Sequence, residues 1–313
     1  MIKISVIVPC HNSEAFINAT IESVINQKLK DWELILVDDG SSDKTWEIIS
    51  KYNLIDHRIS SYKKTNGGTS DTRNYGYSLA NSESKYLFFL DHDDLLHPDT
   101  LIRLSTYLEE TPEVGLVACQ YFMIDERGKA LKSKKSSRWV PGFIFPRKLK
   151  DEEFDTPFVT FFCATGQGPF AMYSRAVYAK TTGWETSFWP HEDTDMFCQM
   201  AINGKVHFLP DKLYYKRTHP AQGMNNFKRV QDSHGSFRKK WDNLNLSNES
   251  GIKMLRDAKR YYYSTHQPFR DLKVARKAFF EFLRSPDRKK LRWFLTLIKS
   301  SASGFLLERF KKY

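Results

Sequence analysis

Two kinds of apolar pattern alternate along the first 125 residues of the chain. Short continuous runs rich in Val, Ile and Leu are typical of buried strands, whereas apolar residues three or four positions apart predict helices. Strands are predicted at residues 3–10, 32–40, 58–65, 85–91 and 114–125, and helices at 12–27, 41–52 and 98–111, with a glycine-rich loop running into another helix at 67–82. Strands that alternate with helices imply right-handed crossovers and therefore a mostly parallel sheet.

Polar residues mark where these helices are predicted to begin. Ser13 is a predicted N-cap of the first helix, and Ser42 or Asp43 of the second, because their side chains can accept hydrogen bonds from the free N–H groups of a first turn. Pro98 lies near the start of the helix at 98–111, where the missing N–H of proline is tolerated.

The pattern is less regular after residue 125. The sequence of residues 128–160 predicts basic and polar connecting segments, and regular secondary structure is predicted again at 168–184 and 191–210. The second of these stretches predicts an amphipathic helix ending at 203–204, and short strands or loop edges are predicted at 205–210 and 212–219. No strand pattern follows residue 225. We therefore expect an α/β domain over residues 1–225 and a mainly helical, basic region over 226–313.

Composition excludes several classes of protein. The 313 residues are 41% hydrophobic, enough for a sizeable core. The four cysteines are far apart and form no CxxC pair, which argues against a zinc site or a disulfide framework and fits a reducing compartment. Pro9 breaks the apolar N-terminal stretch too early for a signal peptide, and no stretch reaches the roughly 20 apolar residues of a membrane span. A cytoplasmic location is expected.

Charge distinguishes the C-terminal end. Residues 251–313 hold 17 Lys and Arg against five Asp and Glu, so they account for the net charge of +11 and leave residues 1–250 close to neutral. A basic tail implies an anionic partner. Its interleaved aromatic residues favour either peripheral attachment to the inner face of the cell membrane or plain packing on the first domain. Nucleic acid is less favoured, because no recognised RNA-binding motif is present.

The densest group of acidic residues lies in "LDHDDLLHP". Asp91, Asp93 and Asp94 follow an apolar run, and carboxylates are ligands suited to Mg²⁺ or Mn²⁺. The alternative is that an aspartate caps the following helix, and we assign that role to Asp94. Capping does not require three aspartates. Asp91 and Asp93 are therefore predicted to hold a divalent metal ion that also binds phosphate oxygens.

A second acidic pair ends the strand at 32–40. Asp38 and Asp39 can accept hydrogen bonds from a ribose or nucleobase, or simply build the turn in "DDGSS". Ligands of parallel α/β sheets bind beyond the carboxyl ends of the strands. This pair and the group around Asp91 are therefore expected in one crevice.

A third acidic group opens the helix predicted after residue 191. Glu192, Asp193 and Asp195 either supply charge to the helix N-terminus or include a general base held near a cleft. Arg73, on the turn after the glycine-rich loop, can face a diphosphate or simply lie in solvent. His219 can bind a metal or a phosphate, or serve as an ordinary hydrogen-bonded residue.

Taken in order, these segments resemble the family 2 glycosyltransferases of the GT-A fold. The resemblance rests on "SVIVPCHNSEAFINATIESVINQ", "ELILVDDGSSDKT", "NGGTSDTRNYG", "FLDHDDLLHPD", "GPFAMYSRAVYAKTTGW" and "HEDTD", and it covers about residues 3–222. It implies a Rossmann-like sheet flanked by helices. It also implies inverting transfer of a sugar from a nucleoside diphosphate sugar, commonly a UDP-sugar, to a glycan or lipid-linked hydroxyl, assisted by Mn²⁺ or Mg²⁺. Bacterial surface polysaccharide or glycolipid synthesis is the setting most often implied.

The resemblance also implies roles for individual residues. The donor site it implies contains Pro9, His11, Asp39, Arg73, Asp91, Arg217 and Gln222. The metal site it implies contains Asp93, Asp91 and His219. The resemblance implies that Asp193 is the catalytic base and that Asp39 contacts the nucleobase. The family often has Tyr where this chain has His11, and an imidazole can still stack on a base.

Two other functions remain open from the sequence. A sugar-phosphate nucleotidyltransferase has a similar sheet but normally opens with a glycine-rich basic loop, which "VIVPCHNSEAF" lacks. A non-catalytic membrane- or nucleic-acid-binding protein would use the basic tail. That function gives no reason for the acidic groups at Asp91 and Asp193 to coexist.

Overall fold

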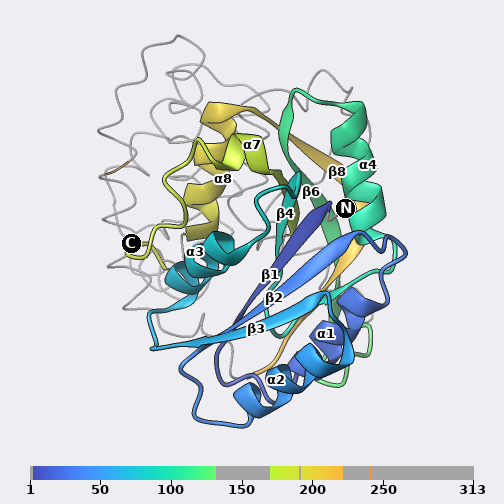
Figure 1. Cartoon of the computed structure of the whole chain (residues 1–313). Helices are drawn as coiled ribbons and strands as arrows, with labels where there is room; N and C mark the ends of the chain where they lie inside the picture. The colour runs from blue at the N-terminus through green and yellow to red at the C-terminus, as the bar shows by residue number, and fades with distance from the viewer. Residues whose placement is uncertain (1–2, 132–169, 190–191, 221–239, 241–313) are drawn as a thin grey trace, which may run out of the picture.

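A computed structural model describes residues 3–131, 170–189, 192–220 and 240 (Figure 1). Its strands are β1 (Ile4–Cys10), β2 (Trp32–Asp39), β3 (Ile59–Lys64), β4 (Tyr86–Phe89), β5 (Leu95–Leu96), β6 (Val114–Ile124), β7 (Ala171–Ser174) and β8 (Lys205–Arg217). Its helices are α1 (Ile17–Ile25), α2 (Thr45–Ile55), α3 (Thr69–Leu79), α4 (Thr100–Glu110), α7 (Arg175–Tyr178) and α8 (Glu192–Asn203). The predicted helical region over residues 226–313 lies outside the described residues apart from Lys240.

The described strands form one sheet in the order β3-β2-β1-β4-β7-β6-β8-β5. The half formed by β3, β2, β1 and β4 is parallel throughout, and β6 pairs with β8 in parallel. β7 runs antiparallel to β4 and β6, and β5 antiparallel to β8. The α/β class is thus confirmed, with a more mixed sheet than expected, because the alternation of elements does not encode the direction of β7.

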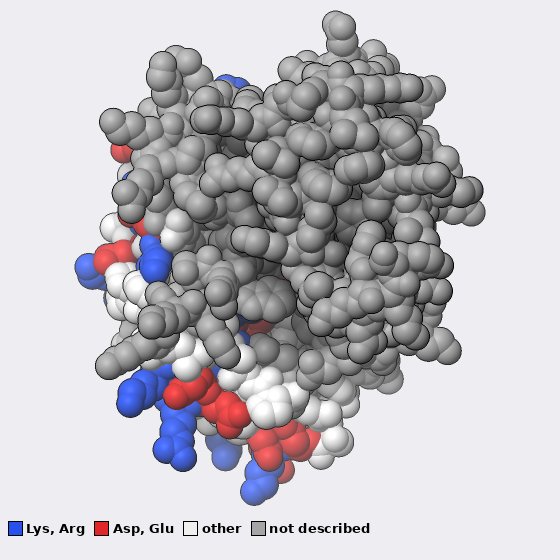
Figure 2. Space-filling model, turned by 180° about the vertical axis from the view of Figure 1, so that it is seen from behind, with Lys and Arg blue, Asp and Glu red and all other residues white. Residues whose placement is uncertain are grey.

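Helices cover both faces of this sheet (Figure 1). Alternate strand residues point to opposite faces, so Val6 and Val8 of β1 pack with α1, α2 and α4 while Ile7 packs on the other side with residues of α3, α7 and α8. Within the described part of the chain, none of the helices combines the length and apolar character needed to cross a membrane. On the rear face, acidic and basic side chains of described residues lie interleaved (Figure 2), in agreement with the near-neutral charge of residues 1–250.

The predicted cap of the first helix is wrong. α1 begins only at Ile17, and its N-terminus has no side-chain cap. Ser13 is instead buried, and its N–H donates to the Thr45 hydroxyl at 2.7 Å, which joins the loops that follow β1 and β2. The predicted cap of α2 is also wrong, because its N-cap is Lys44, which makes no side-chain cap hydrogen bond; Asp43, one residue earlier, accepts a hydrogen bond from the N–H of Thr45 at 2.9 Å.

The two short strands expected at 205–210 and 212–219 form one strand, β8. Its pairing with β6 shifts register where Cys119 faces Leu209 and Gln120 faces Lys212, so residues 210 and 211 are passed over. Proline at 210 has no N–H to contribute to a ladder, which explains the interruption. β5, which the sequence pattern did not predict, pairs with β8 near Tyr214.

Gly76 lets α3 approach the sheet closely, because a Cβ at this position would collide with the Ile7 side chain of β1. Gly76→Ala is expected to lower the free energy of unfolding by about 1–3 kcal/mol, although alanine is the better helix former. Guanidinium-induced unfolding measures the loss. The exposed Ser78→Ala in the same helix is the control, with a change within about 0.5 kcal/mol. Equal stability of the two variants would contradict the close contact.

Candidate active site

The candidate functional groups gather where three neighbouring strands end. β1 lies between β2 and β4 and runs parallel to both, so the carboxyl ends of the three strands meet at one edge of the sheet. Pro9 lies near the end of β1, Asp39 ends β2, and Asp91 follows β4. His92 Nδ1 lies 3.1 Å from the carbonyl oxygen of Pro9 and ties two of these ends together. The two acidic groups thus share the edge that the strand pattern predicts.

A buried arginine connects acidic residues from distant parts of the chain. The Arg73 side chain, on α3, is 2% exposed. Its guanidinium donates to Asp91 Oδ1 at 2.8 Å and to Asp193 Oδ1 at 3.1 Å. Glu192 Oε1 lies 3.7 Å away. Burial alone would lower the pKa of Arg73, but these three carboxylates raise it, so the side chain stays cationic.

An aromatic ring supports this guanidinium. The Trp184 ring centroid lies 4.3 Å from Arg73 Cζ, an arrangement that favours the cation. Asn74, the next residue of α3, accepts from the Trp184 N–H and donates to the Trp184 carbonyl, both at 2.8 Å. A Cβ at Gly183 would lie 2.8 Å from the Asn74 amide oxygen, and φ at Gly183 is +78°. Arg73 is therefore held between α3 and the segment around Trp184.

The two carboxyl groups that open α8 differ in protonation. Burial raises the pKa of Asp193 to about 6, although the Arg73 guanidinium opposes the shift. Burial and the charge of Asp193 raise the pKa of Glu192 to about 8. Asp193 is therefore the more readily ionised member of the pair. Asp193, whose side chain is 20% exposed, is thus the member of the pair that can accept a proton.

The acidic segment after β4 has the donor set of a divalent cation site. Asp91, Asp93 and Asp94 each offer one carboxylate oxygen, and these atoms lie within 4.8 Å of one another. Hard oxygen ligands in this number suit Mg²⁺ or Mn²⁺. Burial would raise the pKa of Asp93, but the imidazoles of His92 and His219 lower it overall. The residues present therefore fit the metal that the sequence implies.

Asp94 does not cap the following helix, contrary to the prediction from sequence. Its buried carboxyl group accepts from the Tyr214 hydroxyl at 2.9 Å and from the Arg217 N–H at 2.7 Å, whereas α4 begins only at Thr100. Burial and the charges of two neighbouring aspartates raise the pKa of Asp94 well above its usual range. The short strand β5 separates Asp94 from the helix, so the carboxyl group ties the acidic segment to β8.

The end of β8 brings two basic residues to this segment. His219 Nε2 lies 2.9 Å from Asp93 Oδ2, and its ring packs 4.6 Å from that of Phe16. Arg217 donates to the Asp93 carbonyl at 2.7 Å and to the carbonyls of residues 125 and 126 at 3.2 and 2.8 Å. Arg217 thus braces the backbone around Asp93, and its contact with a diphosphate stays a prediction. Gln222 lies outside the described residues.

Asp39 organises the glycine-rich loop. Its carboxylate accepts from Lys64 Nζ at 2.6 Å and from the N–H groups of Gly67 and Gly68, both at 2.8 Å. Burial would raise the pKa of Asp39, but these donors lower it overall. Lys64 also pairs with Asp71, in the first turn of α3, at 2.7 Å. Asp39 therefore fixes the loop that leads into α3, the helix that carries Arg73. The contact of Asp39 with a nucleobase stays a prediction.

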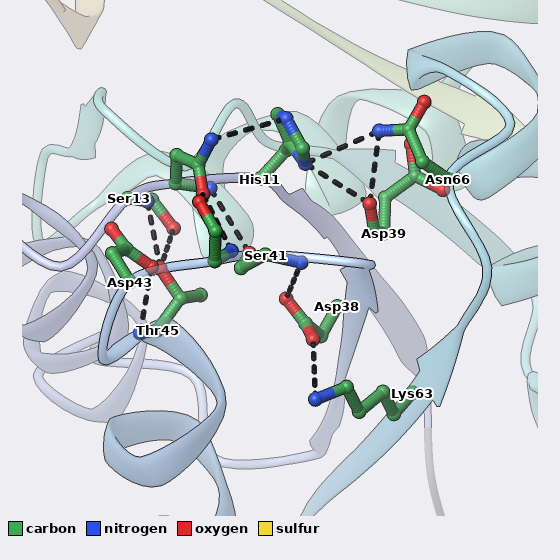
Figure 3. A network of polar contacts seen from close by, with 11 residues as sticks. His11, Ser13, Asp38, Asp39, Ser41, Asp43, Thr45, Lys63 and Asn66 are labelled. Atoms are coloured by element: carbon green, nitrogen blue, oxygen red, sulfur yellow. Dashed lines mark hydrogen bonds and ion pairs between the residues drawn. The ribbon is translucent and has the colours of Figure 1, made fainter.

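Asp38, by contrast, builds the turn after β2 (Figure 3). Its Oδ1 accepts from the Ser41 N–H at 3.2 Å, and its Oδ2 lies 3.9 Å from Lys63 Nζ. The sequence left open whether Asp38 and Asp39 build a turn or bind a ligand, and Asp38 forms that turn.

His11 lies in a network of polar contacts that joins the ends of β1 and β2 (Figure 3). Its Nδ1 lies 3.0 Å from the Asp39 carbonyl oxygen and 3.2 Å from Asn66 Nδ2. Its Nε2 lies 3.3 Å from Asn12 Nδ2, whose amide oxygen accepts from the Ser42 N–H at 2.9 Å. Both ring nitrogens thus contact neighbouring polar groups, and stacking of this ring on a nucleobase stays a prediction.

Sequence reasoning missed three residues that build the site: Lys64, Asn74 and Tyr214. Lys64 ends the strand beside Asp39, and a cation at that position, next to an acidic pair, was a readable signal. Asn74 and Tyr214 gave none, because each is recognised only by the partner that tertiary structure brings to it.

The fold and the site together define an α/β protein in which acidic groups from two distant segments meet at the carboxyl ends of parallel strands, where ligands of such sheets bind. A family model described as Glycosyl transferase family 2 matches residues 5–180. The match covers more than half of the chain, and the chain belongs to this family.

Individual relatives and solved structures agree with this assignment. An uncharacterized glycosyltransferase of Rickettsia bellii is 37% identical over 189 residues, 60% of this chain and 26% of the relative. Poly(ribitol-phosphate) beta-N-acetylglucosaminyltransferase TarP of Staphylococcus aureus is 43% identical over 114 residues, 35% of this chain and 34% of TarP. The chain thus spans about a quarter to a third of the length of these two relatives.

Two solved structures share the GT-A fold. S. aureus TarS 1-349 in complex with UDP-GlcNAc superposes with a TM-score of 0.65 at 18% identity and covers 95% of this chain and 79% of TarS 1-349. Mannosyltransferase PcManGT from Pyrobaculum calidifontis, in complex with GDP-Man and Mn2+, gives a TM-score of 0.58 at 16% identity, with 96% and 86% of the two chains covered. At these identities the likeness establishes the fold.

Proposed function

We propose that the protein transfers a sugar, with inversion, from a nucleoside diphosphate sugar, and specifically a UDP-sugar, to a hydroxyl group of a glycan or lipid-linked acceptor. The observation that carries the proposal is the bridge made by Arg73, which joins Asp91 of the acidic segment to Asp193 of α8. One face of the site can hold the leaving diphosphate, and the other holds a carboxylate that is ionised at neutral pH. Inverting transfer requires this combination.

The reaction then depends on few side chains. Asp193 takes the proton of the acceptor hydroxyl as that oxygen attacks the anomeric carbon, and the bond to the diphosphate breaks with its electron pair. Arg73 keeps Asp193 ionised and orients it. Asp91, Asp93 and His219 surround the position proposed for the diphosphate. A divalent cation held by these carboxylates supplies positive charge for the leaving group.

The proposed classes of donor and acceptor rest on analogy with relatives and solved structures. The TarS structure contains UDP-GlcNAc, and PcManGT contains GDP-Man and Mn2+. TarP acts on poly(ribitol-phosphate), and another relative is a minor teichoic acid biosynthesis protein, GgaB of Bacillus subtilis. A bacterial surface polymer or glycolipid is accordingly the proposed acceptor class, and we propose that the enzyme works in the cytoplasm. Attachment of residues 251–313 to the inner face of the membrane stays a prediction.

A panel of nucleotide sugars incubated with the protein and Mn²⁺ tests the function. Slow release of nucleoside diphosphate from one donor, dependent on the metal, is the expected result. A nucleotidyltransferase would instead release pyrophosphate from a nucleoside triphosphate and a sugar phosphate. Absence of hydrolysis with every donor, or metal-independent hydrolysis, would contradict the proposal.

Asp93→Ala is expected to weaken UDP binding about 10- to 100-fold in the presence of Mn²⁺, because the cation loses a carboxylate ligand. With EDTA present, wild type and variant are expected to bind UDP equally weakly. Isothermal titration calorimetry measures both conditions. If wild-type protein bound UDP with the same affinity in Mn²⁺ and in EDTA, the metal role of Asp93 would be wrong.

A further inference from the structure

We infer that Lys240 is a positioning residue for the catalytic helix α8, through the buried carboxylate of Asp195. The inference rests on the proposed role of Asp193 as the base, two residues earlier on the same helix. Lys240 follows Asp195 by 45 residues in the chain, and both lie beyond residues 5–180, which the family model matches.

The contact between the two residues is a buried ion pair. The Asp195 side chain is fully buried, and Lys240 Nζ donates to its Oδ2 at 2.9 Å, with the lysine side chain 24% exposed. The ammonium also lies 5.3 Å from the ring centroid of Phe188, a buried residue of the segment before α8. Loss of the cation would leave this buried carboxyl group with an uncompensated charge, so we expect the position of α8 to depend on Lys240.

A second set of bonds connects this pair to the other side of the site. Asp195 Oδ2 also accepts from Gln199 Nε2 at 2.7 Å. The Gln199 amide donates to the Gly183 carbonyl at 3.1 Å and accepts from the N–H of Thr182 at 2.8 Å. Gly183 precedes Trp184, whose ring supports the buried guanidinium.

The pair therefore reaches Asp193 along two routes. One runs along the helix itself, and the other through residues 182–184 to Arg73, which bonds the base. Loss of the pair is expected to displace the base while leaving the acidic segment after β4 in place. A displacement of about 1 Å is enough to cost up to about 100-fold in rate. The chemical step, rather than donor binding, should thus depend on Lys240.

Kinetics of four variants test this: Lys240→Met, Lys240→Arg, Asp195→Asn and the double variant Asp195→Asn/Lys240→Met. Lys240→Met is expected to lower kcat for sugar transfer at least about tenfold, with the Kd for UDP within about twofold of wild type. Lys240→Arg should recover most of kcat, since it restores the ion pair. In the Asp195→Asn background Lys240→Met should have no further effect on kcat, because the pair is already lost.

Three results would overturn the inference: an unchanged kcat in Lys240→Met, equal losses in kcat and UDP affinity, or additive effects in the double variant. Hydrogen exchange of the α8 amides provides a readout without turnover and should be faster in Lys240→Met. If wild-type protein transfers no sugar, the proposed function fails. The link between Lys240 and the helix is then decided by this exchange alone, and unchanged exchange would refute it.

Discussion

Asp193→Asn is expected to lower the rate of sugar transfer by about 10²–10⁴-fold, the contribution of a positioned general base. Asparagine keeps the size and one oxygen of the side chain, so Arg73 retains a partner and the fold should persist. It cannot accept the proton of the acceptor hydroxyl. Steady-state transfer with a matched donor and acceptor gives the size of the loss, and calorimetry with UDP should show donor affinity within about threefold of wild type.

The control for this prediction is Asp31→Asn, which removes the same charge at an exposed position and should leave transfer unchanged. Glu192 should not replace Asp193 as the base, because its raised pKa of about 8 makes it a poor proton acceptor at neutral pH. Near wild-type transfer by Asp193→Asn would refute the assignment of the base. A matching loss of UDP affinity would show that the residue acts on the donor rather than on the acceptor.

Strand periodicity predicted the half of the fold that positions this chemistry. Each of β1, β2 and β4 reads as a mainly apolar run, and a polar residue ends it or follows it within two positions, so their shared edge followed from parallel pairing. Local pattern failed where tertiary partners decide. Ser13 resembles a helix cap but bonds Thr45, and Asp94 resembles one but bonds Tyr214. Either contact is compatible with the local sequence, and only the packed chain selects between them.

The same holds for the site: the sequence identified the reactive residues but not the partners that tertiary structure brings to them. The sequence identified Arg73, Asp91 and Asp193 as chemically active, each at the start or end of an element. It gave no reason to place them in contact, because residues 73 and 193 are 120 positions apart. The resemblance placed Arg73 near the donor diphosphate. That placement stays a prediction. In the structure Arg73 contacts the carboxylates of Asp91 and Asp193, and the second contact supports its proposed role in setting the charge of the base.

Arg73→Met is expected to produce the second large effect. The substitution leaves the carboxyl groups of Asp91, Asp193 and Glu192 without their buried cation, and breaking a buried ion pair in this way costs about 3–5 kcal/mol of stability. The loss should depend on pH. The folded-state pKa of Asp193 is already raised, so its ionisation disfavours the fold as pH increases, and removal of the guanidinium raises that pKa further. Thermal unfolding should therefore show the largest difference from wild type above about pH 6.

The same shift in the pKa of Asp193 is expected to change the pH dependence of catalysis. In wild type the transfer rate should fall as pH decreases through about 6, where Asp193 takes up a proton. In Arg73→Met this limb of the pH profile should move to higher pH, so raising the pH should recover part of the lost rate. Arg103→Met, at a half-exposed arginine paired with Asp211, is the matched control and should leave both the limb and the unfolding midpoint in place. A limb that stayed at the wild-type position, with transfer lost equally at every pH, would place Arg73 on the donor diphosphate instead of the base.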